Sequence, residues 1–231
     1  KNRPEIVYHC AAYTAVDKAE GEGKKVNELV NAVGSEIMAK ACKKYDALMV
    51  YVSTDYVFDG LRTEGEYMPD DPKGPRNEYG RTKLLGEQAI EKYCDKYYIV
   101  RTAWVYGKWG HNFVYTMLNL AKNHDRLTVV SDQIGRPTWT RTLAEFLTYL
   151  VDNNIEYGIY QCSNDGQCSW YEFAKEILKD KDVEVVPVSS DEYPTAAFRP
   201  PYSVMHLAKE TAFEFPMWQD ALAEFMKQIE E

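Results

Sequence analysis

The stretch Ala47-Leu48-Met49-Val50-Tyr51-Val52-Ser53-Thr54-Asp55 sets the fold class of this 231-residue chain. Its apolar, partly β-branched run is short and ends in small polar residues, a pattern typical of a strand buried on both faces, as in parallel sheets. A similar run precedes it at residues 6–12, and another follows at residues 97–103. The sequence therefore predicts at least three strands of a buried sheet.

Helical patterns separate these predicted strands. Between residues 26 and 44 apolar side chains recur at helical spacing, and residues 77–94 form a second helix that Asn77 can cap. The order strand, helix, strand, helix, strand predicts an α/β fold with a parallel, right-handed sheet. Beyond Gly110 the elements become shorter and more mixed. We therefore expect a sheet domain over residues 1–110 and a smaller mixed α/β lobe over residues 111–231, with some of its elements returning to the sheet.

The ends of the predicted strands carry polar and aromatic residues. In a parallel α/β sheet, ligands bind outside the carboxyl ends of the strands. Three such ends should meet at one rim, at residues 10–14, 53–56 and 102–107. We therefore expect the chemistry of the protein at this rim.

A Tyr and a Lys four residues apart share one face of a helix. The chain has two such pairs, Tyr79/Lys83 and Tyr171/Lys175, about as many as chance predicts. Tyr79/Lys83 begins the helix that directly follows the strand ending in Thr54, whereas the second pair lies far from the three strand ends. Reduction of a ketone needs a proton donor for the developing alkoxide and a second donor for its oxygen. We therefore expect Tyr79 as the acid, Lys83 as the cation that lowers its pKa, and Thr54 as the second donor, with a purely structural helix face as the alternative.

The composition narrows the classes of partner and of site. A formal net charge of −9 argues against nucleic acid or an anionic membrane as a partner. The five cysteines are scattered, which favours reduced thiols over a disulfide framework, and no ligand spacing predicts a metal. With no apolar run near 18 residues and no signal-peptide pattern, we expect a soluble, cytoplasmic protein.

Three motifs resemble one family. These are Val52-Ser-Thr-Asp-Tyr-Val-Phe-Asp-Gly60, Tyr79-Gly-Arg-Thr-Lys-Leu-Leu-Gly-Glu87 and Arg101-Thr-Ala-Trp-Val-Tyr-Gly107. Together they are similar to the dTDP-4-dehydrorhamnose reductases, a family of extended short-chain dehydrogenases/reductases. The segment Ala11-Ala-Tyr-Thr-Ala-Val-Asp-Lys-Ala-Glu20 resembles the part of that family near the nicotinamide ribose. The resemblance implies a Rossmann-like parallel sheet and a substrate lobe toward the C-terminus.

The resemblance also implies an activity and roles for single residues. The implied reaction is reduction of the C4 ketone of dTDP-4-dehydro-L-rhamnose to dTDP-L-rhamnose by NADPH or NADH, with Tyr79 as proton donor, Lys83 on the nicotinamide ribose and Thr54 tuning the pKa of Tyr79. The implied partner is therefore a nucleotide sugar, while a homodimer stays open. The expected cofactor contacts are Ala11, Ala12, Tyr13, Thr14, Ser53, Tyr79 and Lys83, and the expected substrate contacts are Thr54, Asp55 and Trp104.

Several alternatives remain at this point. Trp104 could be a core aromatic, Asp55 could cap a turn, and Arg136 and Arg199 could bind a diphosphate or form surface ion pairs. The chain also resembles, more distantly, the regulatory subunit of methionine adenosyltransferase, which is a non-catalytic binding protein. A nucleotide-sugar epimerase or dehydratase would share Tyr79 and Lys83.

The chain departs from the family at its start. None of its 13 glycines forms Gly-x-Gly-x-x-Gly or Gly-x-x-Gly-x-x-Gly, the turn whose backbone donors hold a dinucleotide pyrophosphate. A strand candidate follows Lys1 within five residues. We therefore expect an N-terminally incomplete sheet that lacks the region in which such enzymes distinguish NAD from NADP.

Overall fold

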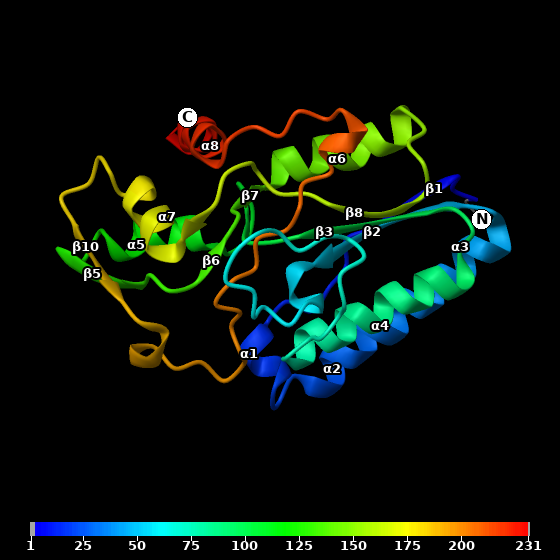
Figure 1. Cartoon of the computed structure of the whole chain (residues 1–231), viewed down its shortest axis with the longest axis horizontal. Coiled ribbons are helices and arrows are strands. Elements are labelled where there is room, and N and C mark those ends of the chain that lie inside the picture. Colours follow the sequence, from blue (N-terminus) through cyan, green and yellow to red (C-terminus); the bar gives the residue numbers. More distant parts are fainter. Residues whose placement is uncertain (1–2, 231) are drawn as a thin grey trace.

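A four-stranded parallel sheet forms the centre of the protein (Figure 1). The computed structural model describes residues 3–230. The sheet has the order β1-β2-β3-β8, and every neighbouring pair is parallel. The strands are β1 (Ile6–His9), β2 (Leu48–Thr54), β3 (Tyr97–Thr102) and β8 (Gly158–Gln161). The predicted α/β class and parallel strand order are thus confirmed.

Helices cover both faces of this sheet, as Figure 1 shows. Met49 and Tyr51 of β2 pack against α3 (Ser35–Tyr45) and α4 (Glu78–Tyr93). Leu48 and Val50 point the other way and pack against α6 (Thr140–Asp152). Because successive side chains of a strand face opposite sides, the continuous apolar run of β2 fills both cores.

The N-terminal part differs from the expectation in two respects. The helix predicted over residues 26–44 follows the short α1 (Val16–Ala19) and consists of α2 (Lys24–Glu28), a π-helical segment η1 (Leu29–Gly34) and α3. The strand expected over residues 6–12 ends at His9 and lies at the sheet edge, where Ile6 and Tyr8 are exposed. β1 pairs only with β2, so its other edge has no neighbouring strand within residues 3–230.

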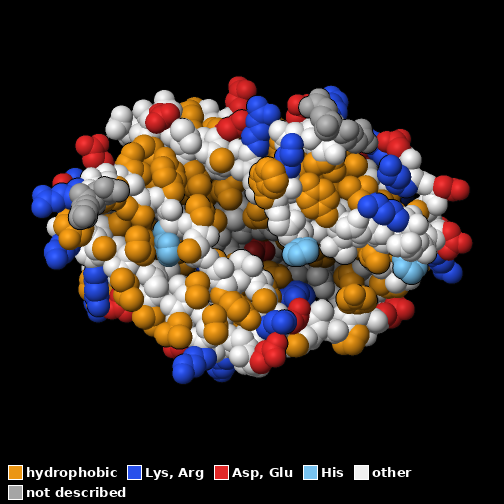
Figure 2. Space-filling view, turned by 180° about the vertical axis from the view of Figure 1, so that it is seen from behind, with side chains coloured by type: hydrophobic (Ala, Val, Ile, Leu, Met, Phe, Trp, Pro, Cys, Tyr) orange, Lys and Arg blue, Asp and Glu red, His pale blue; other side chains and the backbone are white. Residues whose placement is uncertain are grey.

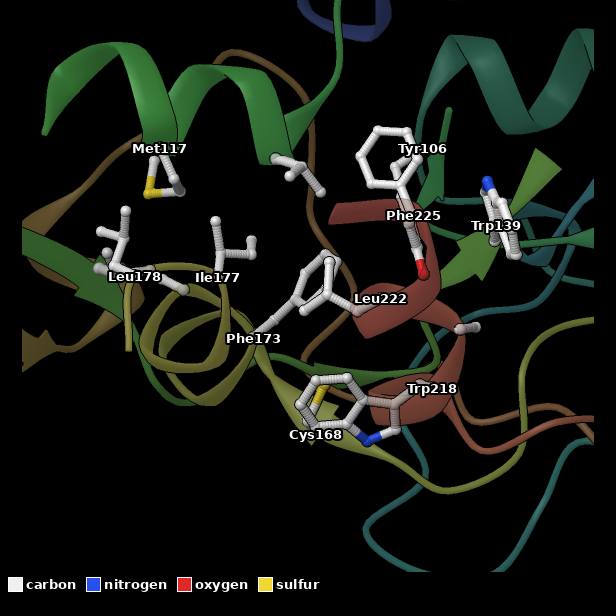
Figure 3. Close-up of a cluster of buried hydrophobic side chains, with 14 of the residues drawn as sticks. Tyr106, Met117, Trp139, Cys168, Phe173, Ile177, Leu178, Trp218, Leu222 and Phe225 are labelled. Atoms are coloured by element: carbon white, nitrogen blue, oxygen red, sulfur yellow. The ribbon is translucent and has the colours of Figure 1, made fainter. Parts of the chain in front are cut away.

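A second lobe follows β3 along the chain. Its strands β5 (Arg126–Val130) and β10 (Glu184–Val188) pair in parallel, and α5 (Phe113–Leu120), α7 (Trp170–Ile177) and α8 (Trp218–Glu230) pack around a buried cluster. Phe173 of α7 lies at the centre of this cluster, beside Leu222 and Trp218 of α8 (Figure 3). Two further two-stranded pairings are short: β4 (Val105–Tyr106) with β7 (Thr138–Trp139), which are parallel, and β6 (Ile134–Gly135) with β9 (Cys168–Ser169), which are antiparallel. β8 is a strand of the main sheet and α6 packs against that sheet, so residues 111–231 contribute to the sheet domain as well as to the lobe.

The remaining elements are short 3₁₀ turns: η2 (Asp55–Val57), η3 (Ser190–Glu192) and η4 (Lys209–Thr211). The segment between η2 and α4 is mainly a long loop, as its Gly, Pro and acidic residues predict. Of the helices within residues 3–230, none combines the length and hydropathy of a transmembrane span.

The lobe core should carry much of the stability of the fold. Phe173 is 0% exposed, so Phe173→Ala would remove buried apolar surface and leave a cavity, at a cost of about 3–5 kcal/mol in the free energy of unfolding. Urea unfolding followed by circular dichroism measures this change. Leu61→Ala, at a 52% exposed position, is the control and should change the free energy by less than about 0.5 kcal/mol. Equal effects of the two substitutions would contradict this assignment of the core.

Candidate functional site

The carboxyl ends of β1, β2 and β3 meet at one rim of the sheet. The parallel register aligns His9 with Tyr51 and Thr54 with Thr102, so the three segments that follow these strands leave on the same side. Viewed from behind, the molecule has a central hollow with an acidic side chain in its depth and hydrophobic side chains on both sides (Figure 2).

The first turn of α4 packs tightly against the segment that follows β2. The Asn77 side chain caps the helix by accepting a hydrogen bond from the Gly80 N–H at 2.7 Å, as the sequence predicts. A Cβ at Gly80 would lie 2.2 Å from the Tyr56 carbonyl oxygen, so glycine permits this close approach. The Tyr79 ring meets the Tyr56 ring edge-on at 5.8 Å between centroids. The cap and the glycine therefore place Tyr79 next to the end of β2.

The phenol of Tyr79 is held in its protonated form. Burial raises the pKa of Tyr79 to about 12, the neighbouring Thr54 hydroxyl opposes this rise, and the Asp55 carboxylate adds to it. Thr54 itself donates a hydrogen bond to Asp55 Oδ1 at 2.9 Å and accepts one from the Tyr56 N–H at 3.2 Å. At neutral pH the Tyr79 phenol thus carries its proton, and the Thr54 hydroxyl lies beside it.

Lys83 follows Tyr79 by one helical turn and is only 2% exposed. Its Nζ donates to the Val52 carbonyl oxygen at 2.7 Å and lies 4.0 Å from the centroid of the Tyr51 ring. Burial lowers the pKa of Lys83 to about 7, and the Glu87 carboxylate counteracts this shift. Lys83 therefore fastens α4 to β2. Its influence on the pKa of Tyr79 remains a prediction, because burial, Thr54 and Asp55 are the causes identified for that shift.

Asp55 lies beneath the rim, 5% exposed. Its Oδ2 is buried and has no hydrogen-bond partner among residues 3–230. Burial raises the pKa of Asp55 to about 6, and the neighbouring Ser203 and Thr54 hydroxyls partly offset this rise. Near neutrality the group therefore lies close to its own midpoint. Asp55 also begins the 3₁₀ turn η2, for which the Thr54 side chain is the cap.

Trp104 faces a second aromatic ring that the sequence reasoning missed. Its backbone has a positive φ of 47°, and its ring stacks on Trp170 with 3.6 Å between centroids and 12° between planes. A Cβ at Gly135 would lie 2.7 Å from the Trp104 ring, so glycine is needed there. A capping box of Ser169 with Glu172 begins α7 and fixes the position of Trp170.

The segment expected to line a cofactor is accessible at the rim. Ala11 and Thr14 are exposed, and Ala12 and Tyr13 are partly so. The buried Asn31 holds this segment at two points: it accepts from the Tyr13 N–H at 2.8 Å and donates to the Tyr13 carbonyl oxygen at 3.1 Å. Asn31 lies in η1, a π-helical segment of the kind often found at functional sites.

The donor set at the rim fits the nicotinamide-ribose end of a dinucleotide. The small side chains of Ala11 and Ala12 leave room for a flat ring to approach the backbone, and the Tyr79 phenol and Lys83 amine are groups that bond to ribose hydroxyls. Ser53 is buried and donates to Glu87 Oε1, so its side chain acts within the wall of the site. A glycine-rich turn for the pyrophosphate is absent from the sequence.

A cavity of about 370 Å³ lies between α5, β5 and the loop that contains Arg199. Arg199 Nη2 pairs with Asp17 Oδ2 at 2.5 Å, whereas Nη1 is buried without a hydrogen-bond partner among residues 3–230. The cavity is also lined by Phe113, Gln133, Trp170 and Tyr193.

Arg136, the other arginine considered for a diphosphate, bonds to the Glu66 carboxylate and to two backbone carbonyls. A larger cavity of about 520 Å³ beside α8 contains none of the predicted site residues. Within residues 3–230 no group of three or more His, Cys, Asp or Glu is placed to hold a metal ion.

The raised pKa of Asp55 predicts how the stability of the protein depends on pH. Because its pKa rises from 3.8 to about 6 on folding, the stability that Asp55 contributes is full below about pH 3.8 and is lost as the pH rises through 6. Asp55→Asn should therefore stabilise the protein more at pH 7.5 than at pH 4, by a difference on the order of 2 kcal/mol. Chemical unfolding at the two pH values measures it. Asp95→Asn, at a 76% exposed side chain, should show no such difference, and a flat response of Asp55→Asn would refute the raised pKa.

Comparisons with known proteins agree with this geometry. The family described as "RmlD substrate binding domain" matches residues 1–231. The spore coat polysaccharide biosynthesis protein SpsK of Bacillus subtilis is 44% identical over 98% of this chain and 80% of its own length. The dTDP-4-dehydrorhamnose reductase of Mycolicibacterium smegmatis is 44% identical over 87% of this chain, which spans 62% of that relative.

The solved structures include a dTDP-4-dehydrorhamnose reductase of Bacillus anthracis in complex with NADP. It superposes with a TM-score of 0.93 at 42% identity, over 98% of this chain and 81% of that one. The fold is therefore Rossmann-like, and the resemblance inferred from the three motifs is confirmed. The chain belongs to the RmlD substrate-binding domain family.

Proposed function

We propose that this protein reduces the C4 ketone of dTDP-4-dehydro-L-rhamnose to dTDP-L-rhamnose with NADPH or NADH, in the synthesis of a dTDP-sugar. The observation that carries the proposal is the protonated Tyr79 phenol beside Thr54, at a rim that also holds Lys83 and the accessible segment Ala11–Thr14. Relatives named for this reaction, 42–44% identical to the chain, support the choice of substrate. We also propose that the protein is cytoplasmic.

In this mechanism the nicotinamide cofactor, when bound, supplies the hydride. Tyr79 donates its phenolic proton to the alkoxide oxygen that develops at C4, and Thr54 supplies a second donor to the same oxygen. Asp55 accepts a hydrogen bond from the Thr54 hydroxyl, so in the proposed reaction this hydroxyl turns from the carboxylate toward the substrate oxygen. Lys83 holds the ribose side of the site to β2. The phenol keeps its proton at neutral pH, but its raised pKa of about 12 makes it a weaker acid toward the alkoxide than an unperturbed phenol.

The nucleotide sugar would span the two parts of the protein. We place the sugar at the rim of the sheet domain, residues 1–110, near Thr54, Asp55 and Trp104. We propose that the diphosphate binds at Arg199 within the lobe of residues 111–231, because this residue lines the 370 Å³ cavity and its buried Nη1 has no hydrogen-bond partner among residues 3–230. The aromatic rings of Phe113 and Trp170 in the same cavity would suit a nucleobase.

A dehydratase of the same superfamily is the second candidate. Asp55 favours it, because a buried carboxyl with a pKa of about 6 next to Thr54 could act as a general acid. A dehydratase would release water from a 4-keto sugar or its precursor without net consumption of the nicotinamide, whereas the reductase consumes one equivalent for each ketone. Cofactor consumption therefore separates the two.

The proton-donor role of Tyr79 can be tested with a matched pair of variants. Tyr79→Phe removes the phenolic proton and should lower kcat by about 10²–10⁴-fold, the usual contribution of a positioned general acid. Turnover is followed by the NADPH absorbance with the 4-keto sugar nucleotide as substrate. Tyr171→Phe, at the other Tyr/Lys pair, is the control and should keep wild-type turnover. If Tyr79→Phe were as active as Tyr171→Phe, Tyr79 would not be the donor.

The assignment of Arg199 predicts a change in substrate binding. Arg199→Met removes a charged hydrogen-bond donor worth roughly 1.5–3 kcal/mol, so the KM for the nucleotide sugar should rise about 10–100-fold with a smaller change in kcat. Steady-state kinetics over a range of substrate concentrations separates the two constants. Arg141→Met, at an exposed ion pair with Glu145 on α6, should leave both unchanged. A wild-type KM for Arg199→Met would remove Arg199 from the binding site.

A further inference from the structure

A fully buried ion pair lies directly behind the rim. Glu87 of α4 and Arg101 of β3 are 1% and 0% exposed. The guanidinium bonds the carboxylate at two points, Nε to Oε1 at 2.9 Å and Nη2 to Oε2 at 2.7 Å. This fork geometry fixes the relative position of both side chains. Neither residue contacts the cavity that we assign to the nucleotide sugar.

The pair joins four segments that surround the site. Glu87 Oε1 also accepts a hydrogen bond from Ser53 Oγ at 2.5 Å, at the end of β2. Arg101 Nη1 donates to the Pro69 carbonyl oxygen at 2.8 Å in the long loop, and the guanidinium lies 5.1 Å from the Phe58 ring. The Glu87 carboxylate thus accepts three hydrogen bonds, one from Ser53 and two from Arg101. The network ties α4, β2, β3 and the loop together immediately before Thr54.

Stability alone is a poor reason for such a pair, because the cost of removing two charges from water offsets much of their attraction. Its position gives a better reason. Lys83 and Glu87 are one turn apart on α4 and bond to consecutive residues of β2, Val52 and Ser53. Two bonds from one helix face to adjacent strand residues fix the register between helix and strand. That register determines how Tyr79 meets Thr54.

Resting on the proposed function, we propose that Glu87, clamped by Arg101, is a positioning residue: it sets the register of α4 against the end of β2 and keeps the charge on the Lys83 amine. The other ionisable groups around Lys83 are His9 and Cys10 at the end of β1 and Tyr51 on β2. Glu87 opposes the effect of burial on the pKa of Lys83 most strongly, ahead of Cys10. Because that pKa lies near 7, a nearby negative charge decides whether the amine is protonated at neutral pH.

The test compares Glu87→Gln with the double variant Glu87→Gln/Arg101→Met. Glu87→Gln keeps the shape of the side chain and an acceptor for Ser53 but removes the negative charge. The double variant removes both charges, so that no unpaired Arg101 guanidinium stays buried. In Glu87→Gln the Lys83 amine, followed by ¹³C NMR of labelled lysine and assigned by its loss in Lys83→Arg, should titrate about one pH unit lower than in the wild type. In the double variant the shift should have the same direction but be smaller, because the Arg101 charge that opposes protonation of Lys83 is removed as well. The same variants should lower kcat more than they change KM, and the basic limb of the pH profile should shift down with Lys83.

Glu91→Gln, an exposed position one turn further along α4, is the matched control and should leave the Lys83 titration and kinetics unchanged. An unchanged Lys83 titration in both Glu87 variants, or a wild-type pH profile in the double variant, would overturn the proposal. The NMR titration does not require turnover. If it shifts as expected while the wild-type protein fails to reduce the 4-keto sugar, the proposed function is wrong and the role of Glu87 stands.

Discussion

The attachment of α4 to the end of β2 is the constraint on which the site depends. Three contacts make it: the Lys83 amine on the Val52 carbonyl, Ser53 on Glu87, and the close approach that Gly80 permits. Each contact uses backbone or a buried polar group, so α4 cannot slide along the sheet without leaving one of them unsatisfied. The position of Tyr79 at the rim follows from this attachment rather than from contacts of its own side chain.

Burial then produces the electrostatics of the site. The same removal from water raises the pKa of Tyr79 and Asp55 and lowers that of Lys83. Since burial always disfavours the charged form, it brings an acid and a base toward neutrality from opposite sides. Asp55 and Lys83 therefore lie near their midpoints at neutral pH, whereas Tyr79 stays protonated. A spacing of four residues between a Tyr and a Lys contains none of this information, because the burial belongs to the fold.

The sequence predicts what local pattern determines. The apolar run of β2 and the Asn77 cap were both located correctly, because each depends on neighbours within a few residues. The π-helical segment η1 was missed, and so were the bonds of its residue Asn31 to Tyr13, 18 residues away. Trp170 was missed as well, because its stacking on Trp104 joins residues from separate elements. Such contacts have no signature in a single sequence.

The ion pair between Asp17 and Arg199 connects the two parts of the proposed site. Asp17 accepts from the Ala197 N–H at 3.0 Å through Oδ1 and pairs with Arg199 through Oδ2, across 182 residues of sequence. The carboxylate thereby fixes the arginine beside the cavity, while the buried Nη1 has no hydrogen-bond partner among residues 3–230. The Asp17 charge also weakens the positive potential that a diphosphate would meet. The ion pair therefore orients the Arg199 side chain but reduces its attraction for a diphosphate.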